Sequence, residues 1–340
     1  MRAMLLAAGR STRLGALGES LPKPLVPVCG YPVIAFGLVA CARAGLLDVV
    51  VNLHHHGDLI REAIGDGSAF GVSVVYSAEV ELLGTGGGLA RARALGLLGD
   101  GPVLAMNAKV VADIDLGAVI ARHRESGADA TLVLRDDPET QSWGAIAADV
   151  TGRVVDILGA RAPVAPQGPV VERMFTGIQV VGPGILGRLR PVFCDTVRDG
   201  YMPALRDGAD IRAVVAPGYF AEHSTPARYL AGNLALLRQP SLVAQVPGPL
   251  LGVDASSRVD PGATLIPPLR ICAGAVVEAD ATVGPDVVVG TGARVAAGAR
   301  VSRSVLWPGT RAEGELRDSV VTTLGVVRVP PSPSHSPTGE

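Results

Sequence analysis

A six-residue aliphatic repeat constrains the fold of the C-terminal part of the chain. Large aliphatic residues recur at every sixth position, and small residues and glycines fill the intervals. The repeat runs without a slip through Val253, Val259, Leu265, Ile271, Val277, Val283, Val289, Val295 and Val301. A strict period of six is typical of a left-handed parallel β-helix, in which each hexapeptide forms one face of a triangular coil. We therefore expect such a β-helix over residues 251–328.

Upstream of the repeat, short apolar runs alternate with segments of helical character. The expected strands are 4–8, 48–53, 72–77, 102–107, 131–135, 144–149 and 175–181, and the expected helices are 32–44, 58–64, 89–98 and 227–237. This alternation predicts a Rossmann-like α/β domain with a mostly parallel, mixed sheet covered on both faces. In such sheets ligands bind at the carboxyl ends of the strands, which here carry Gly9, Asn52, Thr85, Asn107 and Lys109.

The two patterns predict two domains. The α/β domain is expected over residues 1–237 and the β-helix over 251–328. Residues 238–250 are the expected linker, because three prolines fall between 239 and 250. The final residues, 329–340, are rich in proline and serine and are expected to form a disordered tail.

The bulk composition excludes several classes of protein. The formal net charge is -2 and no basic block runs along the chain, which argues against a nucleic-acid partner. No apolar run is long enough to span a membrane. The four cysteines are scattered and are expected to be reduced thiols in a cytoplasmic protein. The chain has 30 basic residues, of which Lys23 and Lys109 are the two lysines, so we expect them where a compact ammonium is needed.

The N-terminal stretch combines features suited to phosphate binding. The apolar run from Met4 to Ala8 predicts a buried strand that ends at Gly9, where a backbone without a Cβ can approach a ligand. Successive N–H groups in such a loop can bind an anion. Arg13 adds a planar guanidinium suited to phosphate. Lys23 stands between two prolines, which hold it on a stiff, extended segment.

In this order, LLAAGRSTRL followed by PKPLVPV resembles the signature of the sugar-1-phosphate nucleotidylyltransferases, also called sugar-nucleotide pyrophosphorylases. Within that family it looks like the mannose-1-phosphate guanylyltransferases and the N-acetylmuramate-1-phosphate uridylyltransferases. The resemblance implies a GT-A-type domain that joins a nucleoside triphosphate to a sugar 1-phosphate, giving an NDP-sugar and pyrophosphate. It also implies that Arg13 binds the triphosphate, that Lys23 binds the phosphates at the reacting centre, and that the nucleotide contacts Leu6, Ala7, Ala8 and Gly9.

The same resemblance implies further binding residues. The run from Gly84 to Gly88 resembles the base-binding loop of the family, so the expected nucleotide contacts include Asn52, Thr85, Gly86 and Gly87. A glycine-rich helix entry with only a packing role explains this run as well. The expected sugar contacts are Asn107, Gly144, Glu172, Thr176 and Gly177. Plain turns between strands explain the segments around Gly144 and Gly177 equally well.

The expected magnesium site departs from the family pattern. Where the family usually has Asn-Gly-Asp, with the aspartate on Mg²⁺, this chain has Asn107-Ala108-Lys109, and the second acid is Glu222. A protonated lysine has no lone pair for a metal. Three hypotheses account for this departure. Lys109 replaces the charge of the metal and is catalytic. Alternatively, Asp113 or Asp115 binds a shifted Mg²⁺ together with Glu222. In the third, catalysis is lost, and the protein binds nucleotide sugar and regulates or partners an active paralogue.

The β-helix has two expected roles. It joins copies of the chain, or the chain and a paralogue, into an oligomer, or it serves only as a stabilising cap. In both cases the open edges of its end coils need to be covered.

Overall fold

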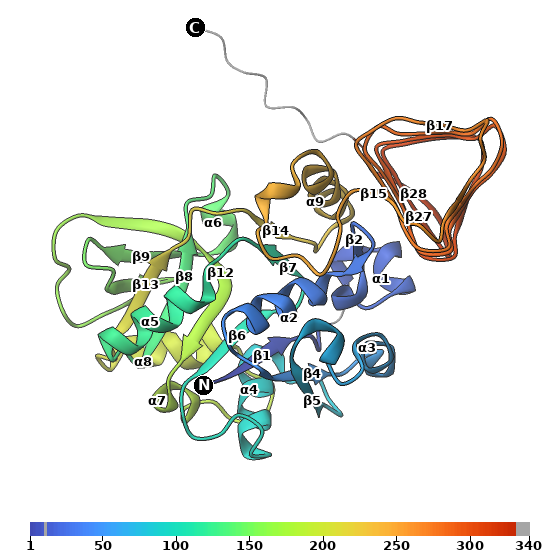
Figure 1. Ribbon diagram of the computed structural model, residues 1–340. Coiled ribbons are helices and arrows are strands. Elements are labelled where there is room, and N and C mark those ends of the chain that lie inside the picture. Colours follow the sequence, from blue (N-terminus) through green and yellow to red (C-terminus); the bar gives the residue numbers. More distant parts are fainter. Residues whose placement is uncertain (10–11, 331–340) are drawn as a thin grey trace, which may run out of the picture. The chain divides into compact units, whose positions relative to one another are not determined.

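The computed structural model describes residues 1–9 and 12–330. Arg10, Ser11 and most of the expected disordered tail lie outside the described residues. The chain divides into two compact units, Met1–Arg10 with Ile34–Phe220 and Ser11–Val33 with Ala221–Glu340 (Figure 1). The second unit therefore combines the lysine-bearing N-terminal segment with the C-terminal part of the chain. The domain boundary at residue 237 and the linker over 238–250 stay predictions.

Among the described residues, ten strands form one mixed sheet in the first unit. They are β1 (Arg2–Leu6), β4 (Asp48–Leu53), β5 (Ser73–Ala78), β6 (Val103–Asn107), β8 (Ala130–Arg135), β9 (Ala145–Asp149), β10 (Val154–Ile157), β11 (Ala160–Arg161), β12 (Val170–Val181) and β13 (Ile211–Val215). The main order is β11-β10-β9-β12-β6-β1-β4-β5, and β8 pairs with both β12 and β13. The strands β6, β1, β4 and β5 are parallel, whereas β12 runs antiparallel to β6, β8 and β9. This architecture confirms the expected Rossmann-like sheet.

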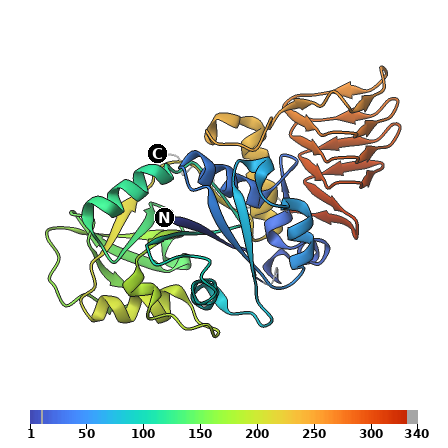
Figure 2. The same ribbon diagram turned by 60° about the horizontal axis from the view of Figure 1, so that its bottom comes forward.

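Helices cover both faces of this sheet. A Cβ at Gly37 of α2 (Val33–Arg43) would lie 3.5 Å from the side chains of Leu5 and Met106. On the opposite face, Met4 belongs to a buried cluster with Leu89. That cluster draws on α4 (Gly84–Ala94), α7 (Pro183–Leu186), the π-helix η4 (Thr196–Tyr201) and α8 (Met202–Arg206). Figure 2 shows α5 (Leu116–Ser126) and the segment 196–206 on opposite sides of the strands.

The remaining elements of the first unit are short. They are α3 (Gly57–Ile64), η3 (Ser68–Phe70), β7 (Val110–Ala112) and α6 (Thr140–Trp143). None of the helices in the described part of the chain is long and apolar enough to cross a membrane.

The helix expected over residues 89–98 is wrong in its bounds, because α4 begins at Gly84 and ends at Ala94. At its start, the N–H groups of Gly86 and Gly87 donate to the carbonyl oxygen of Cys194, at 3.0 and 3.3 Å. The glycine run therefore belongs to the helix and packs against a distant segment. At its end, Gly96 adopts a positive φ of 72°, the left-handed conformation that commonly terminates a helix.

In the second unit, the six-residue repeat forms the expected β-helix. Three stacks of parallel strands make the three faces of a triangular coil (Figure 1), and Figure 2 shows the coils stacked along its axis. The first stack is β15 (Gly252–Val253), β18 (Leu269–Ile271), β21 (Val287–Val289), β24 (Ser304–Leu306) and β27 (Ser319–Thr322). The second is β16 (Arg258–Val259), β19 (Val276–Val277), β22 (Arg294–Val295) and β25 (Arg311–Ala312). The third is β17 (Thr264–Leu265), β20 (Thr282–Val283), β23 (Arg300–Ser302) and β26 (Glu315–Arg317).

The repeat explains the register of the coils. Val253 pairs with Ile271, and Ile271 with Val289, so residues 18 apart, three hexapeptides, stack on one another. Beyond Val301 the spacing shortens, since Leu306 and Val321 continue the same stack. The last coil ends in β28 (Gly325–Arg328), which folds back antiparallel on β27 and covers its edge.

The other elements of the second unit precede the β-helix. They are η1 (Thr12–Leu14), α1 (Ala16–Ser20), η2 (Lys23–Leu25), β2 (Pro27–Val28), β3 (Tyr31–Pro32), β14 (Phe220–Glu222), α9 (Pro226–Arg238) and η5 (Pro240–Leu242). The hydroxyl of Thr225 caps α9 by accepting from the N–H of Arg228 at 3.2 Å, and Pro226 occupies the first turn. The Arg238 guanidinium, at the end of α9, pairs with Asp286 of the β-helix through two hydrogen bonds of 3.0 and 2.7 Å.

Candidate functional site

The backbone after β1 lies at the carboxyl end of the parallel strands. Leu6 accepts from the N–H of Ala108 at 3.1 Å, while Ala7 donates its N–H to Oδ1 of Asn52 at 2.7 Å. Ala7 and Ala8 are buried. A Cβ placed on Gly9 would meet no described atom within 4 Å. Packing within the described protein therefore does not require glycine at this position.

Asn52 is buried, and its side chain connects neighbouring strand ends. Its Nδ2 donates to Oε1 of Glu79 at 2.7 Å, and Oε2 of Glu79 accepts from the N–H of Leu83 at 3.1 Å. Burial raises the pKa of Glu79, although the hydrogen bonds from Asn52 and Leu83 oppose that shift. A Cβ at Gly88 would lie 2.8 Å from both side chains, so glycine is needed there. The sequence analysis missed Glu79, whose signal was an acid directly after β5.

The glycine run at the start of α4 contacts the segment 192–196. The hydroxyl of Thr85 donates to Oδ2 of Asp195 at 3.0 Å and accepts from the N–H of Thr196 at 2.9 Å. A Cβ on Gly87 would collide with the carbonyl oxygen of Val192. These contacts agree with the hypothesis that the glycine run has a packing role. Base binding by Thr85, Gly86 and Gly87 stays a prediction.

The residues expected at the sugar fall into two groups. Asn107 and Gly177 are brought together, because a Cβ on Gly177, whose φ is 76°, would collide with the Asn107 carboxamide. Thr176 is buried and donates its hydroxyl to the carbonyl oxygen of Val133 at 2.8 Å. Further along β12, Oε2 of Glu172 accepts from Gln141 at 2.6 Å. Gln141 lies in α6, and Gly144 with a φ of 90° follows this helix.

The second unit holds two of the expected phosphate-binding cations, Arg13 and Lys23. Lys23 begins the short 3-10 helix η2 and is 8% exposed. Within the same unit, Nη2 of Arg13 lies 3.7 Å from Oε1 of Glu222, and Nη1 of Arg228 lies 3.9 Å from Oε2. Ser224 donates its hydroxyl to Oε2 of Glu222 at 3.1 Å. The carboxylate of Glu222 is therefore already balanced by two guanidinium groups.

Magnesium binding by Asp113 or Asp115 together with Glu222 stays a prediction. Lys109 occupies the turn between β6 and β7. Oδ1 of Asp115 accepts from the N–H of Ala118 at 2.9 Å and caps helix α5. Asp113 donates its N–H to the carbonyl oxygen of Tyr219. Over residues 1–9 and 12–330, no three acidic, histidine or cysteine side chains gather as a metal site would need.

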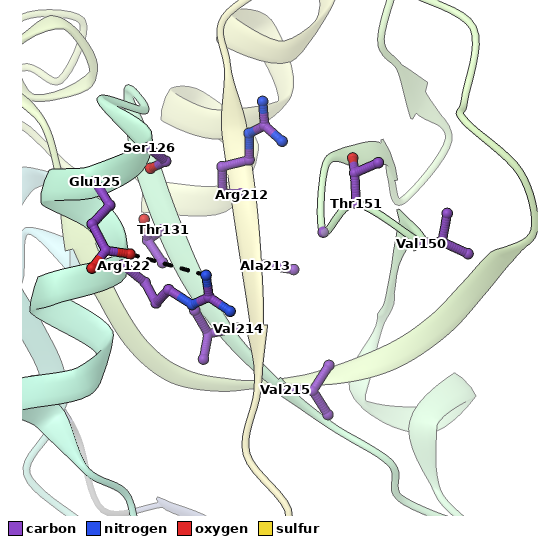
Figure 3. A pocket seen from close by; sticks show the side chains of 11 residues that line it. Arg122, Glu125, Ser126, Thr131, Val150, Thr151, Arg212, Ala213, Val214 and Val215 are labelled. Atoms are coloured by element: carbon purple, nitrogen blue, oxygen red, sulfur yellow. Dashed lines mark ion pairs between the residues drawn. The ribbon is translucent and has the colours of Figure 1, made fainter.

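A cavity of about 530 Å³ lies elsewhere in the first unit, between α5, β13 and the turn after β9 (Figure 3). Nη1 of Arg122 lies 4.0 Å from Glu125, and Nε of Arg212 lies 2.8 Å from Asp210, so both of its arginines are paired. No residue that the sequence analysis placed in a site lines this cavity among the described residues.

Known proteins resemble this chain over most of its length. A sequence model of the family described as nucleotidyl transferase matches residues 2–158. The mannose-1-phosphate guanylyltransferase of Mycobacterium tuberculosis is 30% identical over 278 residues, which cover 81% of this chain and 74% of that protein. The mannose-1-phosphate guanylyltransferase catalytic subunit beta of Drosophila pseudoobscura pseudoobscura is 28% identical over 268 residues, 78% of this chain and 70% of that protein.

The fold has a counterpart among solved structures. The crystal structure of a putative glucose-1-phosphate thymidylyltransferase from Bacillus anthracis matches with a TM-score of 0.58 and 19% identity, covering 70% of this chain and 96% of that chain. This likeness supports the fold, and the relatives of similar sequence support the ancestry. The chain belongs to the nucleotidyl transferase family.

Proposed function

We propose that this protein transfers a nucleotidyl group from a nucleoside triphosphate to a sugar 1-phosphate, releasing pyrophosphate. The observation that carries the proposal is the family match over residues 2–158, which includes Gly9, Arg13 and Lys23. The relatives support the substrate class, since their names specify mannose 1-phosphate and, for a Synechocystis protein 29% identical over 197 residues, glucose 1-phosphate. That Synechocystis match covers 55% of this chain and 50% of that protein.

The reaction is a displacement at phosphorus. A phosphate oxygen of the sugar 1-phosphate attacks the α-phosphorus of the triphosphate and forms the new P–O bond. The bond from the α-phosphorus to the bridging oxygen breaks, and pyrophosphate leaves with its electron pair. Two anions must be held in line while their charge is neutralised. In our proposal Arg13 binds the triphosphate, and Lys23, which stands between Pro22 and Pro24, binds the phosphates at the reacting centre.

The nucleotide is proposed to lie against the backbone after β1. The absence of any described atom near a Cβ on Gly9 supports this, because a ligand can then approach the main chain. Asn52 takes part indirectly in this proposal by holding the N–H of Ala7. The proposed nucleotide contacts are Leu6, Ala7, Ala8, Gly9, Thr85, Gly86 and Gly87, and the proposed sugar contacts are Asn107, Gly144, Glu172, Thr176 and Gly177.

Positive charge at the phosphates is proposed to come from the protein. Lys109 stands where the family pattern has a metal-binding aspartate, and Glu222 is already paired with two arginines. We therefore assign to Lys109 the electrostatic stabilisation of the reacting phosphates. The alternative of a protein without turnover draws no support from the relatives found. An oligomer formed through the β-helix stays a proposal.

A substrate panel tests the function. The purified protein is incubated with each of the four nucleoside triphosphates and with mannose, glucose or muramate 1-phosphate, and pyrophosphate is measured. We expect release that requires both substrates of one pair. A folded protein that binds neither nucleoside triphosphate nor nucleotide sugar at millimolar concentration would overturn the proposal.

A further inference from the structure

Two buried aromatic residues connect the β-helix to the lysine-bearing segment. Trp307 of the β-helix is 2% exposed, and Tyr229 of α9 is fully buried. Nε1 of Trp307 donates to the hydroxyl oxygen of Tyr229 at 2.9 Å, and the two rings meet edge to face at 6.2 Å. The hydroxyl of Tyr229 in turn donates to the carbonyl oxygen of Pro27 at 2.5 Å. The hydroxyl of Tyr229 therefore accepts a hydrogen bond from the β-helix and donates one to Pro27.

Pro27 is stiffly joined to Lys23. The N–H of Val26 donates to the carbonyl oxygen of Lys23 at 3.3 Å, which closes the turn that carries the lysine. Val33 donates its N–H to the carbonyl oxygen of Val26 at 3.1 Å. The next residues form the antiparallel pair of β2 and β3. Since Pro24 and Pro27 also fix two φ angles, the five residues from Lys23 to Pro27 have little freedom. A displacement of Pro27 is therefore passed on to Lys23.

A second buried link runs parallel to the first. Oδ1 of Asn233, one turn along α9, accepts from the N–H of Cys29 at 2.8 Å. Nδ2 of the same side chain donates to the carbonyl oxygen of Tyr229 at 3.0 Å. On the other side of the hairpin turn, Gly30 packs against the thiol of Cys272 in the β-helix, leaving no space for a Cβ. Helix α9 and the β-helix together thus hold both ends of the β2–β3 turn.

The segment that carries Glu222 also contacts Tyr229. His223 is fully buried next to Glu222, and its ring meets the Tyr229 ring edge to face at 6.2 Å with an interplanar angle of 73°. Three aromatic rings therefore form one row, from His223 through Tyr229 to Trp307. Both segments that carry charged site residues in this unit contact the same tyrosine.

We propose that the β-helix sets the position of Lys23, and that Tyr229 and Trp307 are positioning residues for the transfer reaction. The proposal rests on the proposed function, in which Lys23 binds the reacting phosphates. It gives the β-helix a role within the single chain, in addition to any role in assembly. Misplacement of a reacting group by about 1 Å costs about a hundredfold in rate, so a small shift of this turn matters.

The kinetic test uses Tyr229→Phe, which removes the hydroxyl and keeps the ring. The buried N–H of Trp307 and the carbonyl oxygen of Pro27 both lose their partner. We expect kcat to fall between about ten- and a hundredfold, with a smaller change in KM for the nucleoside triphosphate. Trp307→Phe removes the donor instead and should show the same split between kcat and KM.

Tyr201→Phe is the matched control. Tyr201 is also fully buried, and its hydroxyl donates to Oε1 of Gln179 at 2.7 Å in the first unit. This variant loses a comparable hydrogen bond, so its thermal stability should fall by a similar amount while kcat stays within about twofold of the parent. A loss of kcat in the control equal to that in Tyr229→Phe would show that general destabilisation, and not positioning, is responsible.

Hydrogen exchange tests the link without any substrate. In Tyr229→Phe and Trp307→Phe, the peptide covering residues 22–33 should exchange about five- to tenfold faster, and in Tyr201→Phe it should not. If the substrate panel shows no turnover, the proposed function fails. The exchange result still decides whether the β-helix restrains residues 22–33. Unchanged exchange over residues 22–33 in both variants, or unchanged kcat in a protein that does turn over, overturns the inference.

Discussion

Asn52 and Glu79 meet side chain to side chain, with Nδ2 of the amide 2.7 Å from Oε1 of the carboxylate. Asn52 also accepts from the N–H of Ala7, and Glu79 accepts from the N–H of Leu83. The ends of three adjacent parallel strands, β1, β4 and β5, are thereby tied together at the loop proposed to receive the nucleotide. The shape of that loop depends on two buried polar residues that need not touch the ligand.

Replacing Glu79 by glutamine should destabilise the protein. A glutamine amide has one acceptor and one donor group, so either Asn52 or Leu83 loses its acceptor in a buried place. We expect a loss of about 1–3 kcal/mol in the free energy of unfolding, measured by urea denaturation, and a higher KM for the triphosphate. The matched control is Glu81→Gln at an exposed position two residues away. Equal stability of the two variants would contradict this account of Glu79.

The same residue predicts a pH dependence. Burial raises the pKa of Glu79 above its ordinary value of 4.5, so the folded state holds the proton more tightly than the unfolded state does. Its contribution to stability is therefore complete below the unfolded pKa and is lost as the pH rises through the folded pKa. The advantage of the parent over Glu79→Gln in the free energy of unfolding should therefore fall as the pH rises above the ordinary glutamate pKa. Parallel pH curves would refute it.

Gly87→Ala tests the packing of the glycine run. A Cβ there would collide with the carbonyl oxygen of Val192 and lie 2.9 Å from Cβ of Leu83. Because backbone must move to make room, we expect a loss of about 1–3 kcal/mol in thermal or urea unfolding. Gly101→Ala is the control, since its Cβ would meet no described atom within 4 Å. If Gly87→Ala is as stable as the parent, the backbone of segment 192–195 moves at little cost, and this prediction is wrong.

The end of the β-helix gives a prediction about assembly. Ending the chain after Thr322 removes β28 and exposes the edge of β27, whose backbone groups then lack their antiparallel partner. Exposed strand edges pair with other chains, so we expect species of higher mass in light scattering. A chain ending after Pro330 keeps β28 and should scatter like the parent. If both truncated proteins scatter alike, β28 does not protect the edge.

Substitutions of Lys109 distinguish two hypotheses, in which the positive charge at the phosphates comes from the lysine or from a metal ion. If its ammonium supplies the charge at the phosphates, Lys109→Met should lower turnover by about 10²–10³-fold, and Lys109→Arg should retain more activity because the charge is kept. In that case EDTA leaves much of the parent activity intact. If Lys109→Asp instead gains activity that depends on added magnesium, the position is a metal site that the lysine had closed.

Local patterns predicted local structure well, and distant contacts account for what was missed. The period of six predicted the β-helix, and the valine-rich run 48–53 matches β4. The start of α4 could not be read from its glycines, because the carbonyl of Cys194, far along the chain, completes that helix start. Gly96, which ends α4, was a local signal left unused. Similarly, no pattern links Cys29 to Asn233, 204 residues away, so the grouping of Ser11–Val33 with the C-terminal part was not foreseen.

In the proposed reaction, a sugar phosphate oxygen becomes bonded to the α-phosphorus of a nucleotide, with Lys23 at the reacting phosphates. The most direct test supplies the sugar 1-phosphate with ¹⁸O in its phosphate oxygens, together with the nucleoside triphosphate that turns over best, and weighs both products. We predict that all label appears in the sugar nucleotide, that the pyrophosphate is unlabelled, and that Lys23→Met slows both products by orders of magnitude. Label in the pyrophosphate, or no sugar nucleotide from any substrate pair, would contradict the account.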